Sequence, residues 1–114
     1  GLLFIPFTLR AGLYRVQSNI FIGTGDDPEL LRRIRGQGNF VETVPIALLL
    51  LVAMELVGAK DAWLHVLGIA LILGRICHYL AITELAPKVL RPIGMSATMI
   101  TILVSSLWIL INAI

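Results

Sequence analysis

Three long apolar segments dominate the pattern of hydrophobic and polar positions, and short polar stretches separate them. The segments cover residues 40–59, 62–82 and 93–114, and a helix needs about 20 mostly apolar residues to span a membrane. A fourth segment, residues 1–16, is shorter and is interrupted by Arg10, so we expect a truncated first span. The pattern therefore predicts an all-α membrane protein, an up-down bundle of four helices in a single domain, residues 1–114.

Helix-breaking residues mark the connections. Asp27 and Pro28 are typical of an N-cap and a first helical position, so the second helix is expected to begin near residue 28, in water. Residues 58–61 predict a tight turn. The stretch 84–92 links the third and last spans, contains two prolines and is expected to break the third helix.

The composition agrees with a membrane protein. Of the 114 residues 58% are hydrophobic and only 14% are charged, whereas soluble domains carry about 25% charged residues. The mean hydropathy is +0.94. Cys77 is the single cysteine, which excludes an intramolecular disulfide, and no signal peptide is recognised. A net charge of +2 does not suggest nucleic acid as a partner.

Basic residues favour one orientation in the membrane. Of the lysines and arginines outside the three long segments, all but Lys60 lie on the side of the first and third connections: Arg10, Arg15, Arg32, Arg33, Arg35, Lys88 and Arg91. The positive-inside rule places that side in the cytoplasm. We therefore expect a bacterial inner-membrane protein with both termini on the opposite side.

Polar residues recur at helical spacing where the second span begins. Arg35, Asn39 and Glu42 stand at i, i+4 and i+7, which places them within about 60° of one face of a helix. Ionisable groups at membrane depth are costly and usually face the bundle interior or an aqueous cavity. The spacing therefore predicts a polar site on this face.

The third helix carries a matching face. Arg75, His78, Tyr79 and Ile82 share it, and Arg91 stands at the same depth just before the last span. Three helices are thus expected to bring five ionisable groups and one amide together. Such a set suits a small zwitterion with extra carboxylates, such as glutathione, although the charge pattern alone does not single out glutathione. No metal site is predicted.

Simpler interpretations remain open for each residue. Arg35 and Arg91 could reach lipid headgroups, and Glu42 could form a structural ion pair with Arg75. Asn39 could join two helices by a hydrogen bond. His78 could be a satisfied core residue, and the pattern fits Tyr79 as an interfacial anchor.

The spacing RxxxNxxExxP, formed by Arg35, Asn39, Glu42 and Pro45, resembles a signature of a known family. This is the MAPEG family, the membrane-associated proteins in eicosanoid and glutathione metabolism, which includes microsomal glutathione transferases, leukotriene synthase and microsomal prostaglandin E synthase. The stretches 13–16, 27–35 and 74–81 also resemble family segments, and Arg91 falls where the family has the arginine that stabilises the glutathione thiolate.

The resemblance implies a homotrimer of four-helix subunits in which glutathione, as co-substrate, lies between neighbouring subunits near the cytoplasmic side. It implies that Arg91 activates the glutathione sulfur. It also implies that six residues hold glutathione: Arg35, Asn39, Glu42, Arg75, His78 and Arg15. Arg10 is an alternative to Arg15.

Three positions depart from the prostaglandin synthase. Ile82 and Met95 replace tyrosines, and Pro92 replaces a serine, so prostaglandin chemistry is not expected. The expected function is a glutathione transferase or peroxidase that acts on lipophilic electrophiles or lipid hydroperoxides. The alternatives are a non-catalytic member that binds lipids or fatty acids, and a structural or transport bundle in which the charges form ion pairs.

Overall fold

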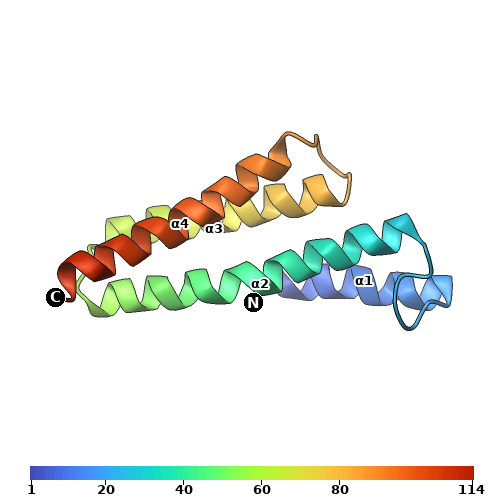
Figure 1. Ribbon diagram of the computed structural model, residues 1–114, viewed down its shortest axis with the longest axis horizontal. Helices are drawn as coiled ribbons and strands as arrows, with labels where there is room; N and C mark the ends of the chain where they lie inside the picture. The colour runs from blue at the N-terminus through green and yellow to red at the C-terminus, as the bar shows by residue number, and fades with distance from the viewer.

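The computed structural model describes residues 1–114 as four α-helices (Figure 1). Their bounds are α1 (Phe4–Ser18), α2 (Pro28–Leu56), α3 (Asp61–Ile82) and α4 (Leu90–Asn112). The all-α prediction is confirmed. By length and apolar composition α2, α3 and α4 can each cross a membrane. Their outward faces are apolar, as Leu49, Val66 and Leu103 illustrate with 70%, 58% and 58% of their surface exposed.

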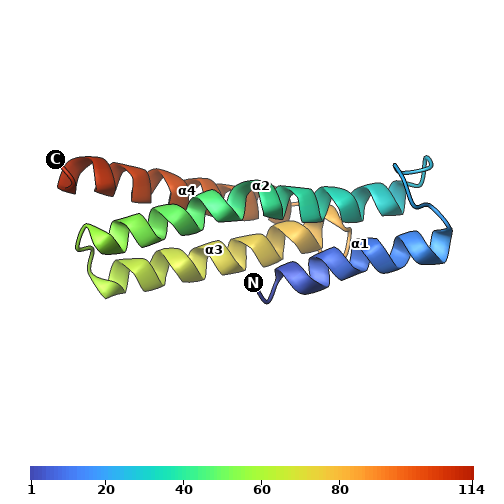
Figure 2. The same cartoon turned by 90° about the horizontal axis from the view of Figure 1, so that it is seen from below.

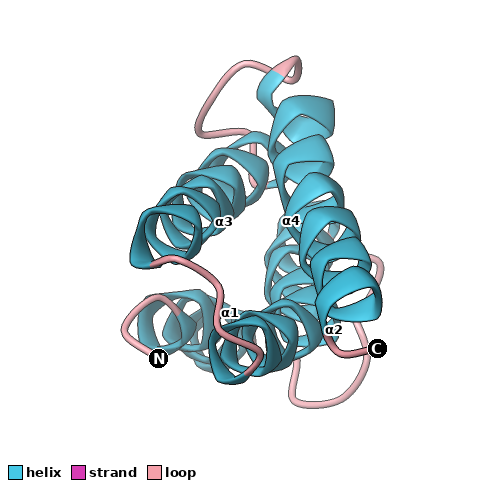
Figure 3. Ribbon diagram, turned by 90° about the vertical axis from the view of Figure 1, so that its left-hand side faces the viewer, coloured by secondary structure: helices cyan, strands magenta, loops and turns pink.

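The helices form two antiparallel hairpins, α1–α2 and α3–α4, which pack on each other in a bundle 53 Å long. Helix α1 runs beside the first half of α2, so the first residue lies next to the middle of α2 (Figure 2). Seen end-on, α4 runs obliquely across the bundle, from its start beside α3 to a C-terminal end on the side of α1 and α2 (Figure 3).

The predicted start of α2 is confirmed. The Asp27 carboxylate accepts hydrogen bonds from the backbone N–H groups of Glu29 and Leu30 at 3.0 and 3.1 Å, and Pro28 is the first helical residue. The Tyr14 hydroxyl donates to the same carboxylate at 2.9 Å, which ties α1 to α2. The Leu30 N–H bond, followed by the Tyr14 and Glu29 bonds, holds the pKa of Asp27 below its usual value.

The last helix begins earlier than the expected last span, residues 93–114. Pro92 lies in the first turn of α4, where a helix needs no backbone N–H donor, so the helix starts at Leu90. At the opposite end Gly58 has φ +88°, the left-handed conformation that commonly follows a helix. Gly58 therefore opens the tight turn expected between α2 and α3.

The expectation that Tyr79 anchors the protein at the membrane surface is wrong. Tyr79 is only 2% exposed, and its ring stacks on that of Phe7 with centroids 3.7 Å apart. Gly36 makes room for it, because a Cβ there would lie 2.7 Å from the Tyr79 ring. Tyr79 is therefore part of the core between α1, α2 and α3.

Candidate functional site

A hollow of about 330 Å³ lies between α2, α3 and the start of α4. We call it the inner hollow. Five of the seven residues predicted for the site line it, and three other residues complete the lining. The five are Arg35, Asn39, Glu42, His78 and Arg91, and the others are Ile34, Gly38 and Ile82. The structure thus gathers side chains from three helices around one space.

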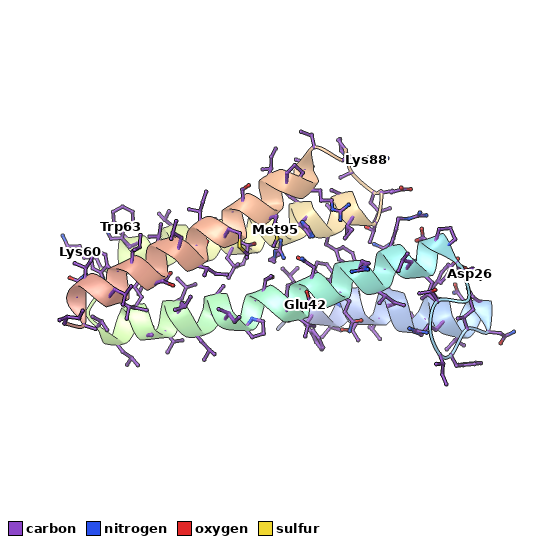
Figure 4. The ribbon with its side chains drawn as sticks, viewed as in Figure 1. Asp26, Glu42, Lys60, Trp63, Lys88 and Met95 are labelled. Atoms are coloured by element: carbon purple, nitrogen blue, oxygen red, sulfur yellow. The ribbon has the colours of Figure 1, made fainter.

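Arg75 does not line the inner hollow. It is 2% exposed and lies behind Asn39. Its Nη1 donates to the Asn39 side-chain oxygen and, at 3.0 Å, to the Thr43 hydroxyl, while Nη2 lies 3.9 Å from the Met95 sulfur. Figure 4 shows Glu42 of α2 and Met95 of α4 at the same level along the bundle. The Arg75 guanidinium therefore joins α2, α3 and α4 and orients the Asn39 amide.

The alternative of a structural ion pair between Glu42 and Arg75 is wrong. The ion pairs of the chain join Arg32 and Arg33 to Glu29, and Arg32 to Glu84. Glu42, Arg35 and Arg91 are exposed and have no ion-pair partner. Two guanidinium groups and one carboxylate of the inner hollow are therefore free to bind a ligand of mixed charge.

His78 fixes the start of α4 on α3. Its Nδ1 lies 3.1 Å from the backbone oxygen of Arg91. Because a carbonyl oxygen only accepts, Nδ1 is assigned the proton and donates this bond. The imidazole is 5% exposed, and its Nε2 has no partner. His78 therefore holds the backbone from which the Arg91 side chain extends.

Arg15 lies outside the inner hollow of its own chain. Its Nη1 donates to the backbone oxygens of Ile20 and Gly23 at 3.2 and 2.8 Å, beyond the end of α1. Arg10, the alternative, lies with its guanidinium carbon 5.5 Å from the centroid of the Tyr79 ring. Neither residue lines the inner hollow.

Two contributors to the site, Thr43 and Gly94, are not among the residues predicted from the sequence. Thr43 receives the Arg75 hydrogen bond and in turn donates to the Asn39 backbone oxygen at 2.8 Å. Its position four residues after Asn39 is a signal that could have identified it. Gly94 lies where a Cβ would be 2.7 Å from the His78 backbone nitrogen, so only glycine allows this approach of α4 to α3.

Comparisons with known proteins identify the class of the chain. The profile of the MAPEG family matches residues 1–111. Inner membrane protein YecN of Escherichia coli K12 is 35% identical over 111 residues, which cover 95% of this chain and 84% of YecN. YecN of Escherichia coli O6:H1 gives the same values. No solved structure matches the chain significantly.

The fold and these comparisons define a helical integral protein of the bacterial inner membrane. The chain belongs to the MAPEG family.

Proposed function

We propose that the chain is one subunit of a homotrimer that binds glutathione in the inner hollow. The glutathione sulfur then reacts with a lipophilic substrate that enters from the bilayer. One observation carries the proposal: Arg35, Asn39, Glu42, His78 and Arg91, from three helices, line one space. Glutathione has two carboxylates, an ammonium and a thiol. The unpaired arginines suit its carboxylates, and Glu42 suits its ammonium.

In this proposal Arg91 acts on the thiol. A free thiol has a pKa of about 8.5, so only a small fraction is thiolate at neutral pH. A guanidinium beside the sulfur favours the charged form and lowers that pKa. The thiolate then forms a carbon–sulfur bond with an electrophile, either by displacing a leaving group from carbon or by adding to an activated double bond, whose electron pair takes up a proton. With a hydroperoxide it attacks the terminal oxygen, and a second glutathione completes reduction to an alcohol, water and glutathione disulfide.

The trimer supplies what a single chain lacks. Arg35, Glu42 and Arg91 are exposed in the single chain, although charged groups at membrane depth are stable mainly when covered or hydrated. A neighbouring subunit against this face would cover them. Arg15 of the partner subunit would then be available to the inner hollow.

The experiment measures glutathione binding and thiolate absorbance on the purified protein across a pH series. We expect binding at millimolar glutathione, as is common for enzyme substrates, whose KM values reach about 1 mM. We also expect the bound thiol to have a pKa lowered by about 1–3, as for a group beside an opposite charge. Arg91→Ala should abolish the shift, and Lys60→Ala, at the opposite end of the bundle, should preserve it.

The outcomes separate the proposal from its alternative. Absence of binding would contradict the whole proposal. Binding without a shifted thiol pKa would favour the non-catalytic member, which the apolar Ile82 side chain in the inner hollow also favours. A lowered thiol pKa that persists in Arg91→Ala would refute only the role assigned to Arg91 and would leave glutathione binding in place.

A further inference from the structure

A second space adjoins the inner hollow on the side of the α3–α4 connection. This outer hollow has a volume of about 660 Å³ and lies between the first turns of α2 and the connection. The two hollows share Arg35, Ile82 and Arg91 as a common wall. Arg32, Glu84 and Lys88 line only the outer hollow, so it has polar groups of its own.

The lining of the outer hollow is strongly basic. Four cations surround it: Arg32, Arg35, Lys88 and Arg91. Its single carboxylate, Glu84, lies 3.7 Å from the Arg32 Nε. Arg32 also pairs with Glu29 at 2.9 Å, so the acids of this region are already engaged. Arg35, Lys88 and Arg91 have no ion-pair partner, and the lining therefore carries a net positive charge.

The outer hollow lies where headgroups are expected. The bundle is 53 Å long, and a hydrocarbon core is about 30 Å thick, so part of the protein extends beyond the core. The α1–α2 hairpin projects past the α3–α4 connection (Figure 1). Figure 4 shows Lys88 at the same end of the bundle as Asp26 and opposite Lys60. The outer hollow occupies the step between the two hairpins, on the side that the positive-inside rule assigns to the cytoplasm.

Exposed apolar side chains neighbour the polar residues of this space along the chain. Leu85 and Val89, on the connection itself, expose 60% and 62% of their surface, and Ile93 in the first turn of α4 exposes 55%. A small soluble anion would make no use of these residues. An anion attached to acyl chains would use both the cations and these exposed apolar side chains.

We propose that the outer hollow binds the phosphate headgroup of an anionic phospholipid. The phosphate oxygens accept hydrogen bonds from the unpaired cations Lys88, Arg91 and Arg35, and the acyl chains lie along Leu85 and Val89. The proposal does not depend on glutathione, because Lys88 does not line the inner hollow. If both proposals hold, the bound lipid lies beside the Arg91 side chain, which identifies phospholipids as candidate substrates.

The chain contains two lysines, one at each end of the bundle, which supply a matched pair of variants. Native mass spectrometry of the detergent-purified protein would count bound dioleoylphosphatidylglycerol and, in a parallel series, zwitterionic dioleoylphosphatidylcholine. We expect at least tenfold tighter binding of phosphatidylglycerol, lost in Lys88→Gln, restored in Lys88→Arg and unchanged in Lys60→Gln. Such a tenfold change equals about 1.4 kcal/mol.

Three results would overturn the proposal. The first is equal binding of the two lipids to the natural sequence. The second is an equal effect of Lys88→Gln and Lys60→Gln, which would show general surface attraction. The third is displacement of phosphatidylglycerol by an equal concentration of inorganic phosphate, which would show a site for free phosphate. Glutathione binding, measured on the same samples, reports separately on the inner hollow.

Discussion

Arg75 is the only fully buried cation of the chain, and it has no carboxylate partner. Its guanidinium is held instead by the neutral oxygens of Asn39 and Thr43. Neutral partners leave the positive charge uncancelled, so the field of Arg75 adds to that of Arg35 and Arg91 around the inner hollow. A buried carboxylate at this position would have removed that contribution.

Removing the Asn39 amide should destabilise the protein. Asn39→Ala leaves part of the Arg75 guanidinium buried without an acceptor, and an unsatisfied buried group costs about 1–3 kcal/mol. The loss should appear as a lower thermal unfolding temperature in detergent. Asn112→Ala is the control, since Asn112 donates one exposed hydrogen bond at the end of α4. Equal effects of the two substitutions would contradict a special role for Asn39.

Asp27 makes the stability of the α1–α2 hairpin depend on pH. Its folded-state pKa is lowered from 3.8, so its contribution is present above pH 3.8 and is lost as the pH falls through the lower folded value. Asp27→Ala should lower the unfolding temperature at neutral pH and reduce the further loss below pH 3.8. Asp26 is an exposed neighbour. Asp26→Asn should change neither the unfolding temperature at neutral pH nor the loss of stability in acid. If Asp27→Ala still loses as much stability in acid as the natural sequence does, the loss is caused by other carboxylates.

At the scale of elements, the crossing of α3 and α4 determines where Arg91 lies. Gly74 and Gly94 face each other there. A Cβ on Gly74 would lie 2.8 Å from the Ala97 Cβ, and one on Gly94 would lie 2.9 Å from the His78 Cβ. The close approach brings the Arg91 carbonyl onto the His78 ring. The crossing therefore links helix packing to the geometry of the inner hollow.

Gly94→Ala should separate the two helices. The added methyl group meets backbone atoms that cannot move aside, and overpacking of this kind costs about 1–3 kcal/mol. We expect a lower unfolding temperature and weaker glutathione binding. Gly68 on α3 has open space around it. Gly68→Ala should therefore leave the stability unchanged or raise it by up to about 1 kcal/mol, since alanine stabilises a helix more than glycine does. Unchanged glutathione binding in a folded Gly94→Ala protein would show that the crossing does not position Arg91.

At the scale of the whole molecule, the open inner hollow predicts self-association. A mass measurement of the protein in mild detergent should give three chains, and dilution into a dissociating detergent should abolish glutathione binding together with the trimer. Arg15→Gln should weaken glutathione binding without lowering the mass if Arg15 reaches the inner hollow of a neighbour. A monomer that binds glutathione fully would contradict this assembly.

Much of the site was predictable because its residues recur at helical spacing. Arg35, Asn39 and Glu42 share one face of α2 by periodicity alone, and His78 and Arg91 follow from equal depth in the membrane. The partners of Arg75 were not predictable in this way. Whether a guanidinium meets Glu42 or Asn39 depends on how α3 is rotated against α2, and a single residue step changes the direction of a side chain by about 100°.

The sequence by itself determined the class of the protein, the number and order of its helices and the start of α2. These features follow from local rules: apolar length, the absence of charge, and the backbone preferences of aspartate, proline and glycine. Only the tertiary structure decided which side chains meet. The rotation of each helix and the close crossing at Gly74 and Gly94 place Arg75 against Asn39 and Thr43, bury Tyr79, separate the inner from the outer hollow and leave Arg15 outside both. Contacts of this kind depend on packing between helices, which periodicity along one helix does not specify.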